Sequence, residues 1–72
     1  MQCSLSGFSV TSNDSVFFAN GNRISIFLVD WWLQFNRVPA CPLTGSVWTD
    51  HDVTQILSKT VTTQKTIEVL NN

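Results

Sequence analysis

The residues closest to a catalytic or metal-binding pattern are Asp50, His51 and Asp52. An imidazole between two carboxylates could act as a general base, and the three side chains together could bind a metal ion. Neighbouring residues of a helix, however, point about 100° apart and cannot converge on one atom. We therefore assign the two acids to the first turn of a helix, where free N–H groups favour negative charge, and predict no catalytic residue here.

Cys3 and Cys41 are the only cysteines in the chain. Zinc sites need closely spaced ligand pairs such as Cys-x₂-Cys, and no such pair exists here, with His51 as the only histidine. No motif places a base beside Cys41, and the glycines are isolated, so neither thiol catalysis nor a phosphate-binding loop is indicated. We predict no metal ion, no cofactor and no enzymatic activity. The thiols are expected to be buried, with one disulfide as the alternative in an oxidising compartment.

Aromatic residues and arginines offer a different chemistry, that of protein recognition. Trp and Arg are enriched at the energetic centres of protein interfaces. Five Phe and three Trp are more aromatic surface than so small a core readily encloses, and adjacent indoles both need partners for their N–H groups. The candidate partner-binding residues are Trp31, Trp32, Trp48, Arg37 and Arg23.

Charge is scarce in this sequence, at 12% of residues and a net charge of −1. The four bases are scattered, which disfavours nucleic acid as a partner because phosphate contacts supply most of that affinity. A weakly charged surface resists self-association little, so a homodimer or another protein partner is expected, and no small-molecule substrate is evident. No apolar run approaches the roughly 20 residues that span a bilayer, and no secretory signal opens the chain, so a cytoplasmic protein without a membrane partner is expected.

The stretch from Ser15 to Arg37 contains most of the aromatic residues and organises the expected fold. Asn20-Gly21 between two β-favouring runs predicts a hairpin with a two-residue type I′ turn. After the turn, strand-like residues continue to about residue 29, and a helical period begins at Leu28. A single helix over residues 23–37 is the alternative. The apolar stripe expected to pack on the sheet is Leu28, Trp31, Trp32 and Phe35, with Asp30 on the opposite side.

The flanking segments complete a small α+β fold. Residues 3–10 alternate apolar and polar side chains with a phase shift at Gly7, which predicts a strand with a bulge. Thr49 is a strong helix N-cap. Residues 66–70 are expected to form a short strand, with a helix capped by Thr62 or Thr63 as the alternative. The prediction is one domain over residues 1–72, an antiparallel β-meander followed by two helices and a C-terminal strand (β-β-β-α-α-β).

The segment from Ala19 to Ile26, a hairpin leading into an amphipathic helix, locally resembles the wing and following helix of excisionase-type winged-helix DNA binders. The resemblance covers only this hairpin and helix. That family places a helix-turn-helix before the wing, whereas a strand and a turn are predicted here. The resemblance implies a DNA-binding regulator in which Asn20, Asn22 and Arg23 contact a minor groove or phosphates.

Together these features predict a small non-enzymatic interaction module that binds a protein partner or itself through an aromatic surface. The composition suits an inhibitor or regulator of the kind that phages and mobile elements encode. A DNA-binding regulator with the Asn20-Gly21 hairpin as its wing is the first alternative. A small enzyme that depends on His51 is the second.

Overall fold

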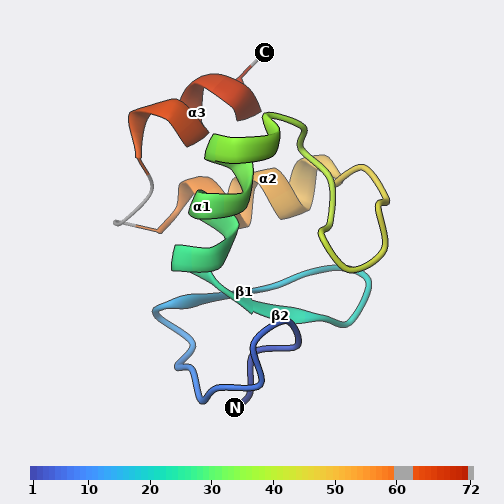
Figure 1. The fold of residues 1–72 in the computed structure, drawn as a ribbon, viewed down its shortest axis with the longest axis vertical. Coiled ribbons are helices and arrows are strands. Elements are labelled where there is room, and N and C mark those ends of the chain that lie inside the picture. The colour runs from blue at the N-terminus through green and yellow to red at the C-terminus, as the bar shows by residue number, and fades with distance from the viewer. Residues whose placement is uncertain (60–62, 72) are drawn as a thin grey trace.

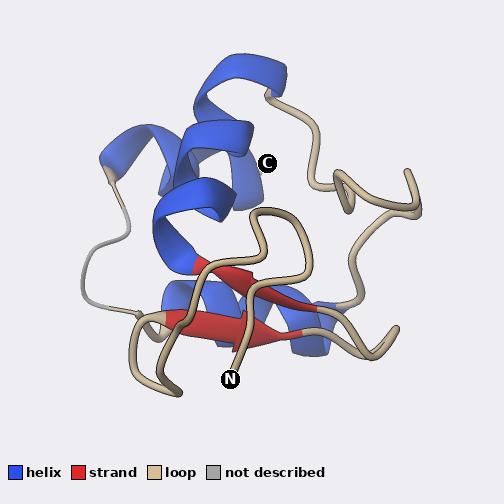
Figure 2. Ribbon diagram, turned by 60° about the horizontal axis from the view of Figure 1, so that its bottom comes forward, coloured by secondary structure: helices blue, strands red, loops and turns tan. Residues whose placement is uncertain are grey.

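In a computed structural model, which describes residues 1–59 and 63–71, the chain forms a two-stranded antiparallel sheet and three helices (Figure 1). The elements are β1 (Ser15–Phe17), β2 (Arg23–Ser25), α1 (Ile26–Asn36), α2 (Asp50–Leu57) and α3 (Gln64–Leu70). The hairpin lies between the helices and the N-terminal segment (Figure 2), with α2 packed on β1 and α3 on α1. The predicted α+β class is confirmed. Within the described ranges, no helix combines the length and apolarity needed to cross a membrane.

The hairpin forms where it is predicted, but its turn is longer. The Phe18 N–H donates to the Asn22 carbonyl at 2.8 Å, and the Gly21 N–H donates to the Phe18 carbonyl at 3.0 Å. Gly21 has a φ of 89°, whereas Asn20 does not adopt positive φ. The result is a three-residue loop of Ala19, Asn20 and Gly21 in place of a two-residue type I′ turn. The Asn20 carboxamide oxygen accepts from the Asn22 N–H at 3.0 Å. This bond closes the loop while the Asn20 backbone stays out of the left-handed conformation.

The strand predicted over residues 3–10 is wrong. The Gly7 N–H donates to the Cys3 carbonyl and the Cys3 N–H donates to the Phe8 carbonyl, each at 2.8 Å, so the chain turns back on itself. Only an isolated bridge between Gln2 and Ser9 follows. Gly7 has a φ of 78°, a left-handed conformation that glycine adopts without steric cost. The phase shift at this residue therefore marks a turn and not a bulge.

The predicted C-terminal strand is also wrong, and the helical alternative is confirmed. Thr63 is the N-cap of α3, and its hydroxyl accepts from the Thr66 N–H at 3.4 Å. Thr66 and Val69 face the core. A good cap and a buried face outweigh the β-preference of Thr, Ile and Val. Thr62, the other predicted cap, lies outside the described residues.

A strand followed by a helix is confirmed after the hairpin, but the strand expected to about residue 29 ends at Ser25 and the helix already begins at Ile26. Of the predicted stripe, only Leu28 and Trp32 pack against the core, and Asp30, expected on the opposite side, is buried. Ile26, Val29 and Leu33 are fully buried, whereas Trp31 is 54% and Phe35 71% exposed. Two apolar stripes compete on this helix, because Ile26, Val29 and Leu33 are also spaced at helical intervals. The helix begins directly after β2, and Ile26 is fully buried like Ile24 of the strand. The inward stripe lies on the side of Asp30, whose carboxylate accepts from the Thr63 N–H.

Two buried carboxylates join the helices to neighbouring segments. One oxygen of Asp30, on α1, accepts from both the N–H and the hydroxyl of Thr63 at 2.9 Å, which holds the start of α3. Asp52, on α2, accepts from the Ala19 N–H at 2.9 Å and from the Thr49 N–H at 3.2 Å. The second bond completes a capping box with the predicted N-cap. Hydrogen bonds to a charged acceptor are stronger than neutral ones, which suits these carboxylates to linking separate elements.

Replacing Asp30 with Asn should lower the free energy of unfolding by about 2 kcal/mol at neutral pH, because charge-assisted bonds to a buried group are lost. Burial raises the pKa of Asp30, but hydrogen bonding from Thr66, Thr63 and Gln34 outweighs burial and holds this pKa below its ordinary value. Because this pKa is lowered on folding, the ionised carboxylate stabilises the fold at pH values above its unfolded-state pKa of about 3.9. This contribution to the free energy of unfolding disappears as the pH falls through the folded-state pKa. Urea unfolding at neutral and acidic pH measures both effects.

The matched control for this prediction is Asp50→Asn, which changes an exposed carboxylate of α2. It should alter stability less than Asp30→Asn does and should preserve the acid-dependent loss. Equal destabilisation by the two variants, or an unchanged acid profile in Asp30→Asn, would contradict the role given to Asp30.

Candidate functional site

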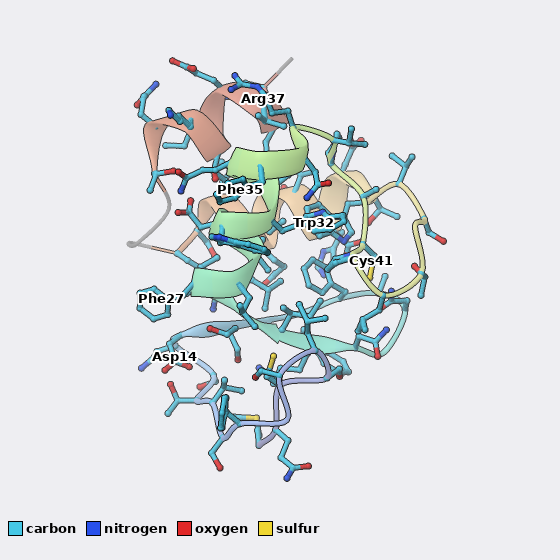
Figure 3. The ribbon with its side chains drawn as sticks, viewed as in Figure 1. Asp14, Phe27, Trp32, Phe35, Arg37 and Cys41 are labelled. Carbon is cyan, nitrogen blue, oxygen red and sulfur yellow. The ribbon has the colours of Figure 1, made fainter. Side chains whose placement is uncertain are left out.

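The most unusual surface of the molecule is an aromatic ridge on α1, formed by Phe27, Trp31 and Phe35. The three residues follow one another at intervals of four, which places them on one side of a helix. Phe27 is 59% exposed and, like Trp31 and Phe35, presents most of its ring to solvent. Figure 3 shows Phe27 pointing away from the body of the molecule. The rings of Trp31 and Phe35 touch, with centroids 5.0 Å apart and planes tilted by 50°.

The ridge carries no charge of its own. Asp30 is the only charged residue of α1, and its side chain is buried against Thr63. An exposed aromatic surface without charged groups is typical of the central part of a protein interface.

A hollow of about 340 Å³ adjoins the ridge at Phe27, between the N-terminal turn and the beginning of α1. Phe8, 77% exposed, also borders it. The walls are largely apolar, and Asp14 is the only charged residue among them. The complete lining is Ser6, Phe8, Ser9, Val10, Asp14, Ser25, Phe27 and Leu28.

Two of the predicted partner-binding residues instead hold the loop between α1 and α2. Trp32 points towards this loop, which also carries Cys41 (Figure 3), and its indole N–H donates to the Ala40 carbonyl at 2.8 Å. Trp48 is 6% exposed and stacks on Phe18, with ring centroids 5.0 Å apart and planes 3° from parallel. These indoles therefore have structural roles, and of the three tryptophans only Trp31 offers a largely exposed ring.

The two predicted arginines have different environments. Arg23 donates from Nη1 to the Ser15 hydroxyl at 2.9 Å, and its guanidinium lies 5.1 Å from the centre of the Phe17 ring, so it is engaged within the hairpin. Arg37 is exposed at the C-terminal end of α1. The structure does not gather the five predicted residues into one site, although Arg37 and Trp48 border a common hollow at the helix ends.

The residues that the winged-helix resemblance places on DNA are mostly engaged inside the molecule. Asn20 donates from Nδ2 to the Cys41 sulfur at 3.5 Å and accepts from the Asn22 N–H. The Arg23 guanidinium is held by the hairpin. Residues 1–14, which precede the hairpin, contain turns and isolated bridging residues and no helix.

The acid and histidine cluster at the start of α2 diverges, as predicted. Asp50 and His51 are exposed, whereas the Asp52 carboxylate is buried against the Ala19 N–H. Across residues 1–59 and 63–71, no three His, Cys, Asp or Glu side chains are arranged to hold a metal ion.

A short repeated motif escaped the sequence analysis. The pattern Cys-x-Leu-Ser/Thr-Gly occurs at residues 3–7 and again at residues 41–45. Both copies form the same turn: the Gly45 N–H donates to the Cys41 carbonyl at 2.7 Å, as the Gly7 N–H does to that of Cys3. Comparing the two cysteine neighbourhoods residue by residue would have revealed the motif.

The sulfur of each turn accepts hydrogen bonds. The Cys3 sulfur accepts from the N–H groups of Ser6 and Ser25, each at 3.4 Å. Burial raises the pKa of both thiols, but these bonds at Cys3 and those from Leu43, Thr44 and Asn20 at Cys41 hold each pKa below its usual value. Both cysteines are buried and free, which confirms the predicted thiols and excludes the disulfide in this structure. Their burial makes them structural acceptors.

No protein-family model, curated protein or solved structure matches the chain. The candidate functional site is therefore identified from the exposure, charge and residue types of the surface. Within the described part of the chain, the aromatic ridge combines exposure, lack of charge and the residue types that dominate interface energetics.

Replacing Trp31 or Trp32 with alanine should show which of the two neighbouring side chains contributes to the stability of the core. Trp31→Ala should change the free energy of unfolding by less than about 0.5 kcal/mol, because the ring is largely exposed. Trp32→Ala should cost about 3 kcal/mol, because it removes packing and leaves the Ala40 carbonyl without its donor. Chemical denaturation of both variants checks this prediction. A larger loss for Trp31→Ala than for Trp32→Ala would mean that the ridge belongs to the core.

Proposed function

We propose that this chain is a small non-enzymatic interaction module that associates with a second copy of itself through the aromatic ridge of α1. The observation that supports this proposal is the ridge itself. Phe27, Trp31 and Phe35 together expose roughly 300–450 Å² of apolar surface, taking 150–250 Å² for each aromatic side chain. Patches of this size on a small protein are often functional.

The spacing of the ridge favours a second copy as the occupant. Trp31 lies midway between Phe27 and Phe35, four residues from each. When two such helices pack antiparallel about a twofold axis, Trp31 of one copy meets Trp31 of the other, and each Phe27 meets a Phe35. An interface of this kind is self-complementary, as closed dimers require.

Charge also favours pairing of identical surfaces. Two copies of a charged patch repel each other, whereas the ridge has no charged member. The low net charge of the whole chain, −1, adds little long-range repulsion.

The hollow beside Phe27 provides a place for the partner's ridge to insert. In the antiparallel arrangement, Phe35 of the second copy lies opposite Phe27, next to the hollow between Phe8 and Leu28. Phe35 is 71% exposed, so most of its ring is available for this insertion. The three rings alone fall short of the roughly 800 Å² per partner in a standard interface, and contacts at the hollow enlarge the buried area.

The central position of Trp31 allows a charge-complementation test. Trp31→Asp and Trp31→Lys should each yield a monomer, because two like charges then meet across the twofold axis. An equimolar mixture of these variants should associate again, because opposite charges meet. Light scattering and analytical ultracentrifugation over a concentration series, up to about 1 mM, detect association as weak as about −4 kcal/mol.

The control is Val47→Asp, which places the same charge at a residue that is 73% exposed and outside α1. It should leave the wild-type dimer intact, and reductant should have no effect because both cysteines are buried. A wild-type chain that stays monomeric up to the highest concentration would overturn the proposal and make a different protein the candidate partner. Persistence of the dimer in Trp31→Asp would exclude the ridge as its interface.

A further inference from the structure

A second hollow lies between the C-terminal ends of α1 and α3 and the N-terminal part of α2. Its volume is about 410 Å³. Three of its seven lining residues are aliphatic side chains of α2 and α3, and two others carry opposite charges. The lining residues are Arg37, Pro39, Trp48, Asp50, Val53, Val69 and Leu70.

Arg37 brings a cation to this hollow. Its guanidinium makes no hydrogen bond or ion pair within the described part of the chain. Its backbone has a φ of 55° and caps α1, with its N–H donating to the Leu33 carbonyl at 2.9 Å. Glycine or asparagine is usual at such a left-handed cap, because other side chains strain the backbone there. An arginine here strains the backbone more than a glycine would, so helix capping does not explain it. Its exposed positive charge suits a binding role instead.

Trp48 adds a donor to the same hollow. Its indole nitrogen is buried and has no hydrogen-bond acceptor among residues 1–59 and 63–71. A buried donor without a partner destabilises a fold, so such groups are uncommon. Because Trp48 lines the hollow, an acceptor bound there is a candidate partner for the unmet donor.

We propose that this hollow binds a carboxylate attached to an aliphatic group of about the size of a leucine side chain. Arg37 pairs with the carboxylate, since a guanidinium matches the two oxygens of a carboxylate. Val53, Val69 and Leu70 surround the aliphatic part. Asp50, on the border, repels any anion, so the pairing with Arg37 must outweigh this repulsion, and a second negative charge on the ligand is disfavoured further. The inference is independent of the aromatic ridge, because none of the ridge residues lines this hollow.

The experiment titrates isotope-labelled protein with 4-methylpentanoate and with 4-methylpentanamide, its neutral counterpart, and follows the three indole N–H resonances by NMR. The Trp48 resonance should move, because its donor gains an acceptor, while that of Trp32, already bonded to Ala40, should stay in place. The carboxylate should bind at least tenfold more tightly than the amide. Equal affinities, or a shift confined to Trp31, would overturn the proposal.

Two Arg37 variants keep the test independent of folding. Arg37→Gly should raise the melting temperature, because it relieves the left-handed strain, and should still weaken carboxylate binding at least tenfold. Arg37→Gln should weaken binding similarly. The matched control, Arg23→Gln, alters an arginine engaged in the hairpin and should leave carboxylate affinity unchanged. Unchanged binding in a folded Arg37→Gly protein would contradict the role of the guanidinium.

The carboxylate could belong to a free acid or to the end of a peptide. A tripeptide ending in leucine, compared with its C-terminal amide, distinguishes these sources. Tighter binding of the free-ended peptide than of 4-methylpentanoate assigns the hollow to a chain terminus. Tighter binding of 4-methylpentanoate assigns it to a small organic acid. If the free-ended peptide bound no more tightly than its amide, a chain terminus would be excluded as the source of the carboxylate.

Discussion

Buried side-chain acceptors that bind distant hydrogen-bond donors are the interaction on which this structure depends. The two strands have only three residues each, so the sheet can pair few backbone groups. Buried N–H groups elsewhere still need acceptors, because an unpaired one costs about as much as a lost hydrogen bond. In this chain, side chains meet part of that need, and in doing so they connect segments that share no sheet.

Four such acceptors each connect segments that are far apart in the sequence. Asp52 binds the N–H of Ala19 in the hairpin loop, and Asp30 binds that of Thr63 at the start of α3. The sulfurs of Cys3 and Cys41 bind groups at opposite ends of the hairpin: the backbone N–H of Ser25 for Cys3 and the carboxamide of Asn20 for Cys41. The repeated Cys-x-Leu-Ser/Thr-Gly turn thus places an acceptor at each end of the hairpin.

This way of holding the fold together also shapes the surface. The face of α1 that buries Asp30 also buries Ile26, Val29 and Leu33, and it leaves Phe27, Trp31 and Phe35 outside. The same chain ends α1 at a strained arginine beside a hollow, where glycine would cap the helix with less strain. Both features give up some stability or solubility that a purely structural sequence would keep, which is typical of positions with a function. No ridge residue lines that hollow, so the proposed self-association and the proposed carboxylate binding would use different residues.

The structural features that the sequence by itself predicted are those that depend on interactions between neighbouring residues. The hairpin at Asn20-Gly21, the Thr49 cap of α2, the divergence of Asp50, His51 and Asp52 and the strand-to-helix change after the hairpin all follow from neighbouring residues. Trp31 was also identified as a candidate, because an exposed indole was expected from the surplus of aromatic residues.

Contacts between residues far apart in the sequence decided the rest. Two stripes of α1 are apolar, and the stripe that became the core lies on the side where Asp30 meets Thr63, 33 residues away. The helix at residues 64–70 begins at that same Thr63, although its composition favours a strand. Trp32 and Trp48 became structural because a loop folds over one and Phe18 stacks on the other. None of these partners is adjacent in the sequence, so periodicity and propensity carry no information about them, and the tertiary structure alone decided which aromatic side chains remained on the surface.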